Sequence, residues 1–168
     1  MPDNWDDNVL LSVLPSLRRF ALSLARSTED AEDLVQEVSL RVVRNGVPDG
    51  ANLKHWSFRV CKNVWIDQLR RKKVRTEGSA EILTQSPTSE DGEGGLERRS
   101  ELESVMQIMS TLPEDQQIAL SLVALEGMSY REVSEVMEVP MGTVMSRIAR
   151  ARKQIADRLA NQGEEAHD

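Results

Sequence analysis

The sequence feature that most directly indicates a chemical role is a dense run of positive charge near the middle of the chain. Residues 46–75 hold eight Lys and Arg against two acids. The densest part of this segment consists of Arg70, Arg71, Lys72, Lys73 and Arg75. Clustered cations suit contacts with phosphates, because neutralising the phosphates releases their counterions. The whole chain has a net charge of −7, which argues against a protein that coats nucleic acid unaided.

Cysteine and histidine, which many catalytic and zinc sites require, are scarce in this chain. Cys61 is the only cysteine, and His55 and His167 are the only histidines, so a zinc site of the usual kind cannot be assembled from this chain. We find no phosphate-binding loop and no pairing of a histidine with a nucleophile. The sequence therefore predicts no enzyme, no cofactor, no metal and no small-molecule substrate.

The chain also lacks the marks of export. Its first residues include Asp3, Asp6 and Asp7 rather than a basic stretch followed by an apolar run, which is unlike a signal peptide. No apolar stretch approaches the roughly 20 residues that span a bilayer. A single cysteine is compatible with a reducing compartment. We expect a soluble, cytoplasmic protein.

Apolar residues that recur with helical spacing predict three helices in the first part of the chain, and the last of them carries the basic run. Ser27 looks like an N-cap, and a stripe of apolar residues from Ala31 to Val42 predicts a helix of about 28–45 that Asn45-Gly46 ends. A helix of about 9–26 precedes it. A helix of about 53–74 follows it and carries the cations together with two tryptophans, Trp56 and Trp65. For each tryptophan, core packing and stacking on nucleic acid both remain open.

A composition break separates this first helical block from a second one. Residues 76–100 are rich in Gly, Ser and acids and hold few apolar side chains, so we predict a flexible acidic linker there. The second block, 101–161, restarts a helix at Pro113 and stops it at Gly127. A capping box at Ser129 and Glu132 then opens a short helix. A last helix of roughly 141–160 follows a tight turn, and we expect a disordered tail at 162–168.

A short helix, a tight turn and a longer helix with a basic outer face form the arrangement of a helix-turn-helix DNA reader. On the last helix Ser146, Arg150 and Lys153 lie opposite the apolar stripe, where they could approach base edges and phosphates. A merely solvated basic face remains the alternative interpretation of this pattern.

Several motifs, in order, resemble a known family. The segment Asp30–Glu37 (DAEDLVQE) is similar to the signature of sigma region 2. The segments 112–114, 126–133 and 140–147 are similar to sigma region 4. The chain therefore resembles the extracytoplasmic-function (ECF) group of the sigma-70 family. The resemblance implies an all-α fold, with region 2 as a three- to four-helix bundle in 1–75 and region 4 as a helix-turn-helix in 101–161.

The same resemblance implies the function and the partners. The chain would be an RNA polymerase sigma factor that binds the core enzyme and directs promoter-specific initiation at −10 and −35 elements. Its partners would be the beta-prime coiled coil and the beta subunit of the polymerase core, promoter DNA and an anti-sigma factor. The residues implied to dock on the core polymerase are Asp33, Gln36, Glu37 and Leu40. Independently of the resemblance, Leu40 is an apolar residue in a charged face, which is a modest interface signal; a singly exposed leucine without a partner remains the alternative interpretation.

The resemblance also assigns DNA contacts. Asn63 has an amide suited to reading a base that has left the stack, and the nearby cations could hold the strand. The residues implied to act at the −10 element are Asn63, Lys62, Arg70, Arg71, Lys72 and Lys73. Those implied to act at the −35 element are Thr143, Ser146, Arg147, Arg150 and Arg152. Met145 and Ala149 depart from the family pattern, where basic or larger residues are common, which leaves the −35 bases open.

Two other classes of binding protein share part of this pattern. An ordinary helix-turn-helix repressor or activator would account for 128–160 but not for the segment 30–37 or the basic helix. A sigma mimic that sequesters an anti-sigma factor is typically joined to a receiver domain, for which 168 residues leave no room. A pull-down with core polymerase followed by run-off transcription separates these possibilities.

Overall fold

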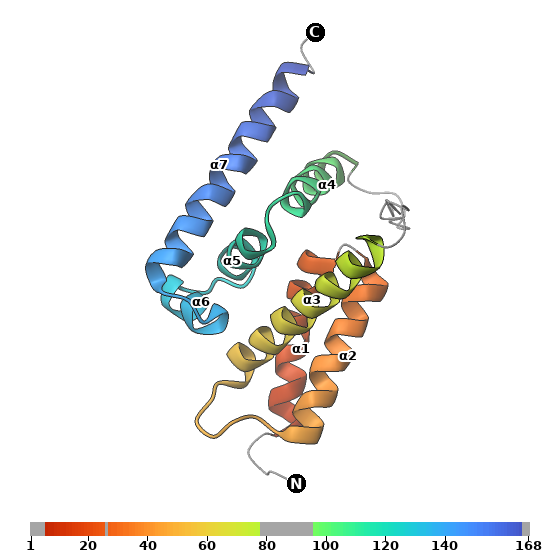
Figure 1. The fold of residues 1–168 in the computed structure, drawn as a ribbon, viewed down its shortest axis with the longest axis vertical. Helices are drawn as coiled ribbons and strands as arrows, with labels where there is room; N and C mark the ends of the chain where they lie inside the picture. The colour runs from red at the N-terminus through yellow and green to blue at the C-terminus, as the bar shows by residue number, and fades with distance from the viewer. Residues whose placement is uncertain (1–5, 26, 78–95, 166–168) are drawn as a thin grey trace. The chain divides into compact units, whose positions relative to one another are not determined.

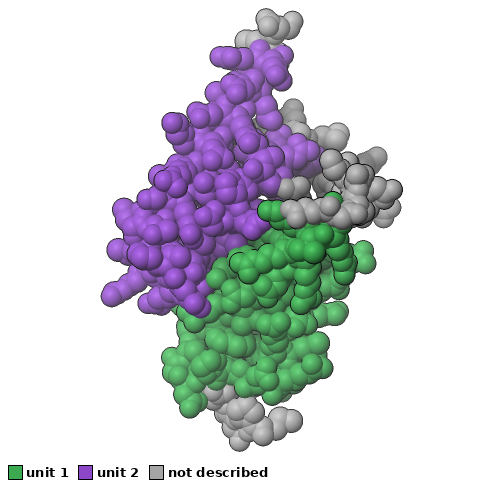
Figure 2. Space-filling view, in the orientation of Figure 1, with its two compact units in different colours: residues 1–88 green, residues 89–168 purple. Residues whose placement is uncertain are grey.

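The computed structural model describes residues 6–25, 27–77 and 96–165, and within them it contains seven α-helices and no strand. The chain divides into two compact units, residues 1–88 and 89–168 (Figures 1 and 2). The predicted all-α class is therefore confirmed. Among the described residues, no helix combines the length and the apolar character that a membrane span requires.

Unit 1 is a bundle of three helices, α1 (Asp7–Ala25), α2 (Thr28–Asn45) and α3 (Leu53–Glu77), each of which packs against the other two. Its centre is aromatic and aliphatic. The rings of Phe20 and Phe58 meet edge to face with centroids 5.1 Å apart, an arrangement that aromatic pairs favour. The fully buried aliphatic residues around them are Leu17, Leu24, Leu34, Val38 and Val42.

Helix α2 has the bounds that the sequence predicts, because local chemistry defines both of its ends. The Ser27 hydroxyl accepts a hydrogen bond from the Asp30 amide at 3.1 Å and caps the helix. Such a cap contributes about 1 kcal/mol. At the other end Gly46 adopts a φ of 69°, a conformation that suits glycine and stops the helix. The apolar stripe from Ala31 to Val42 faces the core, as predicted.

The buried side of α3 carries the cysteine and one of the two tryptophans. Cys61 is fully buried, and this burial raises the pKa of its thiol to about 12. Trp65 is buried as well, and the Nζ atom of Lys72 lies 5.9 Å from its ring centroid, within the range of a cation–π contact. Trp56 is only half-buried. Of the two interpretations left open for the tryptophans, core packing therefore applies to Trp65.

Unit 2 contains four helices, α4 (Leu96–Ser110), α5 (Glu114–Ala124), α6 (Tyr130–Met137) and α7 (Met141–Glu165). The long helix α7 packs against the other three. The apolar side of α7 consists of Val144, Ile148 and Ala151, all buried. The buried residues that this unit contributes from α5 and α6 include Ile118, Leu122, Val133 and Val136.

The predicted capping box at the start of α6 is confirmed. The Ser129 hydroxyl accepts from the Glu132 amide at 3.2 Å, and the Glu132 carboxylate accepts from the Ser129 amide at 2.8 Å. Helix α6 ends at Met137, and its C-cap Glu138 takes a left-handed φ of 58° and turns the chain toward α7. This short helix, turn and long helix form the helix-turn-helix arrangement that the sequence predicts.

Three helix ends lie beyond their predicted positions. Helix α3 extends to Glu77 and α4 begins at Leu96, so both helices enter the range 76–100 predicted as linker, and residues 78–95 lie outside the described residues. Helix α7 continues to Glu165 through most of the predicted disordered tail, and residues 166–168 lie outside the described residues. The extra turns consist mostly of good helix formers such as Leu, Glu and Arg. Gly163 costs only about 1 kcal/mol in a helix and does not stop α7.

Candidate functional site

Helix α3 exposes most of the residues predicted to act at the −10 element. Asn63 is exposed, and so are the four consecutive cations Arg70 to Lys73. Lys62 differs from them, because only 8% of its surface is exposed. A lysine with a buried stem can still extend its ammonium group to the surface. The structure nevertheless presents Lys62 less openly than the other five residues of the set.

The outer face of α2 combines charge with apolar side chains. Asp33 and Gln36 are exposed, and Leu40 is 46% exposed, as expected for a docking face. Sequence reasoning missed Val43, which is 45% exposed and lies one turn beyond Leu40. Its spacing of three from Leu40, outside the buried stripe, was the available signal. Two neighbouring apolar side chains within a charged face are a stronger interface signal than one.

Glu37 lies at the edge of this face and is engaged within its own helix. Its Oε1 atom accepts a hydrogen bond from the Nε atom of Arg41 at 2.9 Å, four residues along α2. Both side chains are almost half-exposed, so this ion pair adds only about 0.3–0.5 kcal/mol to stability. A partner could therefore displace it at little cost.

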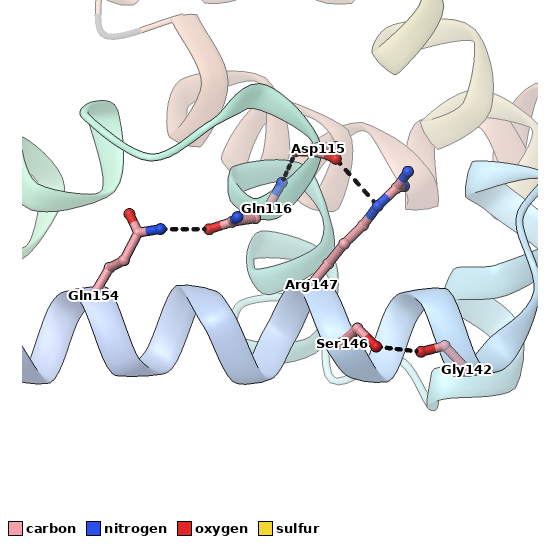
Figure 3. A network of polar contacts seen from close by, with 6 residues as sticks. All are labelled: Asp115, Gln116, Gly142, Ser146, Arg147 and Gln154. Carbon is pink, nitrogen blue, oxygen red and sulfur yellow. Dashed lines mark hydrogen bonds and ion pairs between the residues drawn. The ribbon is translucent and has the colours of Figure 1, made fainter.

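The start of α7 is tied to the start of α5 by a polar network (Figure 3). The Nε atom of Arg147 lies 3.2 Å from the Oδ2 atom of Asp115, and in the close-up Arg147 leaves α7 toward this carboxylate. The other oxygen of Asp115 accepts from the Gln116 amide at 2.9 Å. Two turns further along α7, Gln154 donates to the Gln116 side-chain oxygen at 3.3 Å. These contacts hold α7 at a fixed position on α5.

This network changes the interpretation of Arg147. The sequence predicts it as a reader of the −35 element, whereas the structure places its side chain, 22% exposed, against a carboxylate of the same unit. Sequence reasoning missed Asp115, since nothing in the spacing of two residues 32 positions apart relates them.

The remaining predicted −35 residues lie along α7 at different depths. Thr143 is half-buried. Ser146 is exposed, but its hydroxyl donates to the Gly142 carbonyl at 3.0 Å and so points back along its own helix (Figure 3). Arg150 and Arg152 are exposed. The exposed charge of this set therefore lies on Arg150 and Arg152.

No metal centre can be built from the part of the chain that the structure describes, because it holds no group of three or more His, Cys, Asp or Glu side chains arranged for a metal ion. The site is thus a set of helix faces, α2 and α3 in one unit and α7 in the other. Such faces bind macromolecules through charge and surface shape.

Comparisons with known proteins identify the family. Residues 10–75 match the family model for sigma-70 region 2, and residues 102–155 match that for sigma-70 region 4. The ECF RNA polymerase sigma factor EcfG of Rhodopseudomonas palustris is 32% identical over 98% of this chain and 90% of its own length. The ECF RNA polymerase sigma factor SigE of Mycolicibacterium smegmatis is 32% identical over 96% of this chain and 64% of its own length.

A solved structure is similar over most of its length. The sigma factor RpoE of Bartonella quintana, crystallised in complex with the anti-sigma factor NepR, is 30% identical in sequence. It superimposes with a TM-score of 0.77 over 91% of this chain and 95% of that protein.

Proposed function

As this chain belongs to the extracytoplasmic-function (ECF) RNA polymerase sigma factors, non-enzymatic subunits that initiate transcription, we propose a division of labour between its two units. Unit 1, within residues 1–75, docks on the core polymerase and opens the −10 element. Unit 2, within residues 101–161, reads the −35 element. One observation carries this proposal: each unit exposes cations along one helix, α3 in unit 1 and α7 in unit 2.

The −10 step rests on α3. Opening a promoter requires a base to leave the stack, which costs about a few kcal/mol. The exposed amide of Asn63 can both donate and accept hydrogen bonds, as reading of a base edge requires. The cations Arg70 to Lys73 then hold the phosphates of the separated strand, and Lys62 adds to them if its ammonium group reaches the surface.

The −35 step rests on α7, whose exposed Arg150 and Arg152 contact duplex DNA. Thr143 and Ser146 lie at the start of the same helix, where the two side chains are close to the groove. We assign Arg147 a positioning role, because its ion pair with Asp115 connects α7 to α5 and so helps to set the angle between these two helices.

Docking rests on the outer face of α2. The polar residues Asp33, Gln36 and Glu37 lie on the same face as the apolar pair of Leu40 and Val43, and this face binds the beta-prime coiled coil of the polymerase. The beta subunit is a further contact of the chain within the assembled enzyme.

An anti-sigma factor is a further proposed partner. The similar structure from Bartonella quintana contains one, and the exposed faces of α2 and α7 are available for occlusion. Membership of the family further supports a cytoplasmic location, where the polymerase transcribes.

A core-binding assay with run-off transcription tests the docking part. The double change Gln36→Lys and Leu40→Glu places a new charge of each sign on the face, and we expect affinity for core polymerase to fall about a hundredfold. Leu11→Glu is the matched control, since Leu11 is 61% exposed on α1 of the same unit. Both variants should keep wild-type helicity and melting temperature. Normal core binding by the double variant would place the docking surface elsewhere.

A further inference from the structure

The first two turns of α7 carry two large apolar side chains on the outside of the unit. Met141 is 49% exposed and Met145 is 50% exposed, while Val144 between them is fully buried. Residues four apart lie on the same side of a helix, with Cβ atoms about 5–6 Å from each other. The two methionines therefore form one exposed apolar pair, and the packing of unit 2 does not account for it.

The surface beside this methionine pair is shallow. Gly142 has no side chain, and no atom lies within 4 Å of the position a Cβ would take. Ser146 is short, and its hydroxyl is turned back onto the Gly142 carbonyl. Ala149, one turn beyond Met145, is small and exposed. A helix with so little bulk at its start can come close to the floor of a groove, with the methionines as its longest outward side chains.

The charge around the methionine pair favours DNA over a protein partner. Residues 141–156 hold four cations and no acid. One of the four, Arg147, is paired with Asp115, whereas Arg150, Arg152 and Lys153 are exposed further along the helix. An apolar pair followed by exposed cations suits a groove floor bordered by phosphates. The start of the helix also lacks an exposed arginine, the side chain that most often recognises guanine.

We propose that Met141 and Met145 read the −35 element by contacting the C5 methyl groups of thymines in the major groove. The proposal rests on the proposed function, in which α7 enters the major groove at that element. The thymine methyl is the one apolar group that a base pair presents there, and apolar side chains recognise it by contact. Methionine is long and flexible enough to follow methyl groups on base pairs stacked about 3.4 Å apart.

The test uses the full chain assembled with core polymerase, on a promoter in which only the −35 positions are randomised. Selection by holoenzyme binding should enrich thymine at two neighbouring positions of one strand. Each of these thymines is then replaced by deoxyuridine, which pairs identically but lacks the methyl group. We expect promoter affinity to fall about fourfold for each methyl removed, as for one buried CH₂ group.

Protein variants connect this loss to the methionines. In Met145→Ala, deoxyuridine at the thymine that Met145 contacts should cause no further loss of affinity, because the contact between Met145 and the methyl group is already absent. The response at the other thymine should remain. Met106→Ala is the matched control, since Met106 is 48% exposed on α4 of the same unit. That control should keep the full fourfold response. Equal deoxyuridine responses in the wild type and Met145→Ala would overturn the proposal, as would a loss of core binding in Met145→Ala without DNA, which would make the pair a protein contact.

Failure of this inference is distinguishable from failure of the proposed function. If the selection yields a −35 preference that weakens in Arg150→Ala but ignores thymine methyls, α7 reads the element by other contacts and only the methionine proposal fails. If the wild-type holoenzyme shows no −35 preference at all, both the methionine proposal and the assignment of α7 to that element are overturned.

Discussion

The cations of α3 and those of α7 are held in opposite ways. On α3, four of them are consecutive, so they point in directions 100° apart around the helix, and all are exposed. On α7 the Asp115 carboxylate anchors Arg147, the first cation of the helix, while Arg150, Arg152 and Lys153 are exposed further along. A ring of exposed charge attracts a strand from many directions without fixing its register. A helix anchored to its neighbour presents its side chains at one angle, as recognition of bases in a groove requires.

This difference implies that the α3 cations contribute mainly affinity for DNA, whereas α7 contributes mainly sequence preference. Phosphate contacts supply affinity that depends on salt, whereas base contacts supply sequence preference. The comparison therefore predicts different responses to salt, to promoter melting and to loss of the anchor.

The largest expected effect comes from removing the α3 charges. Changing Arg70, Arg71, Lys72 and Lys73 to Gln removes up to four phosphate contacts with single-stranded DNA. The slope of log affinity against log salt should then become shallower by about 3, and affinity at 0.1 M salt should fall on the order of a hundredfold. Holoenzyme binding to promoter DNA at several salt concentrations measures both quantities. An unchanged slope would show that the α3 cations do not contact phosphates.

The next effect separates the two modes of reading. Asn63→Ala should slow open-complex formation on duplex promoters and weaken the preference for one −10 base. On a template already melted there, the opening defect should shrink while the lost preference remains. Arg150→Ala should weaken −35 recruitment on both templates, by about 1–3 kcal/mol if it contacts a base edge in bidentate fashion and by less if it touches phosphate. The same dependence on melting in both variants would contradict the division between the units.

The smallest effect is expected from the anchor on α7. Asp115→Asn leaves Arg147 without its ion-pair partner, and since the pair is partly exposed, unit 2 should lose about 0.5–1 kcal/mol of stability. Discrimination among −35 sequences should weaken because α7 is held less firmly. Glu114→Gln removes a neighbouring acid from the same first turn of α5, so it controls for the interaction of a carboxylate with the helix dipole. Thermal unfolding and −35 competition binding measure the two consequences.

A double-mutant cycle with Arg147→Gln completes this test. If Asp115→Asn has the same effect in the presence and absence of Arg147, the ion pair does not act as an anchor.

The sequence predicts best where structure is determined locally. The bounds of α2 follow from Ser27 and Gly46, two residues that act within one helical turn of themselves. The capping box of α6 is equally local, and the family motifs supply the order of the elements. The candidate faces of α2, α3 and α7 could also be predicted, because helical periodicity separates their buried from their outer sides.

The tertiary contacts that decide which side chains on those faces are exposed could not be predicted from helical periodicity. The pairing of Arg147 with Asp115 depends on how α5 packs against α7, and the near-complete burial of Lys62 likewise depends on tertiary structure. Val43 was missed for a different reason, since a β-branched residue beside a buried stripe suggests core packing. The helix ends at Glu77, Leu96 and Glu165 lie in polar sequence outside the apolar stripes, so helical periodicity does not mark them.

The buried thiol of Cys61 allows local opening of the unit 1 bundle to be measured by alkylation. With a pKa of about 12 and no exposed surface, Cys61 is almost entirely neutral near pH 8, and reagents cannot reach it in the folded state. Alkylation must therefore wait for a fluctuation that separates α3 from α1 and α2. When reclosing is fast relative to modification, the rate of alkylation measures the fraction of time for which those helices are apart. Because Cys61 is the chain's single cysteine, that rate can be followed in the isolated protein without changing its sequence.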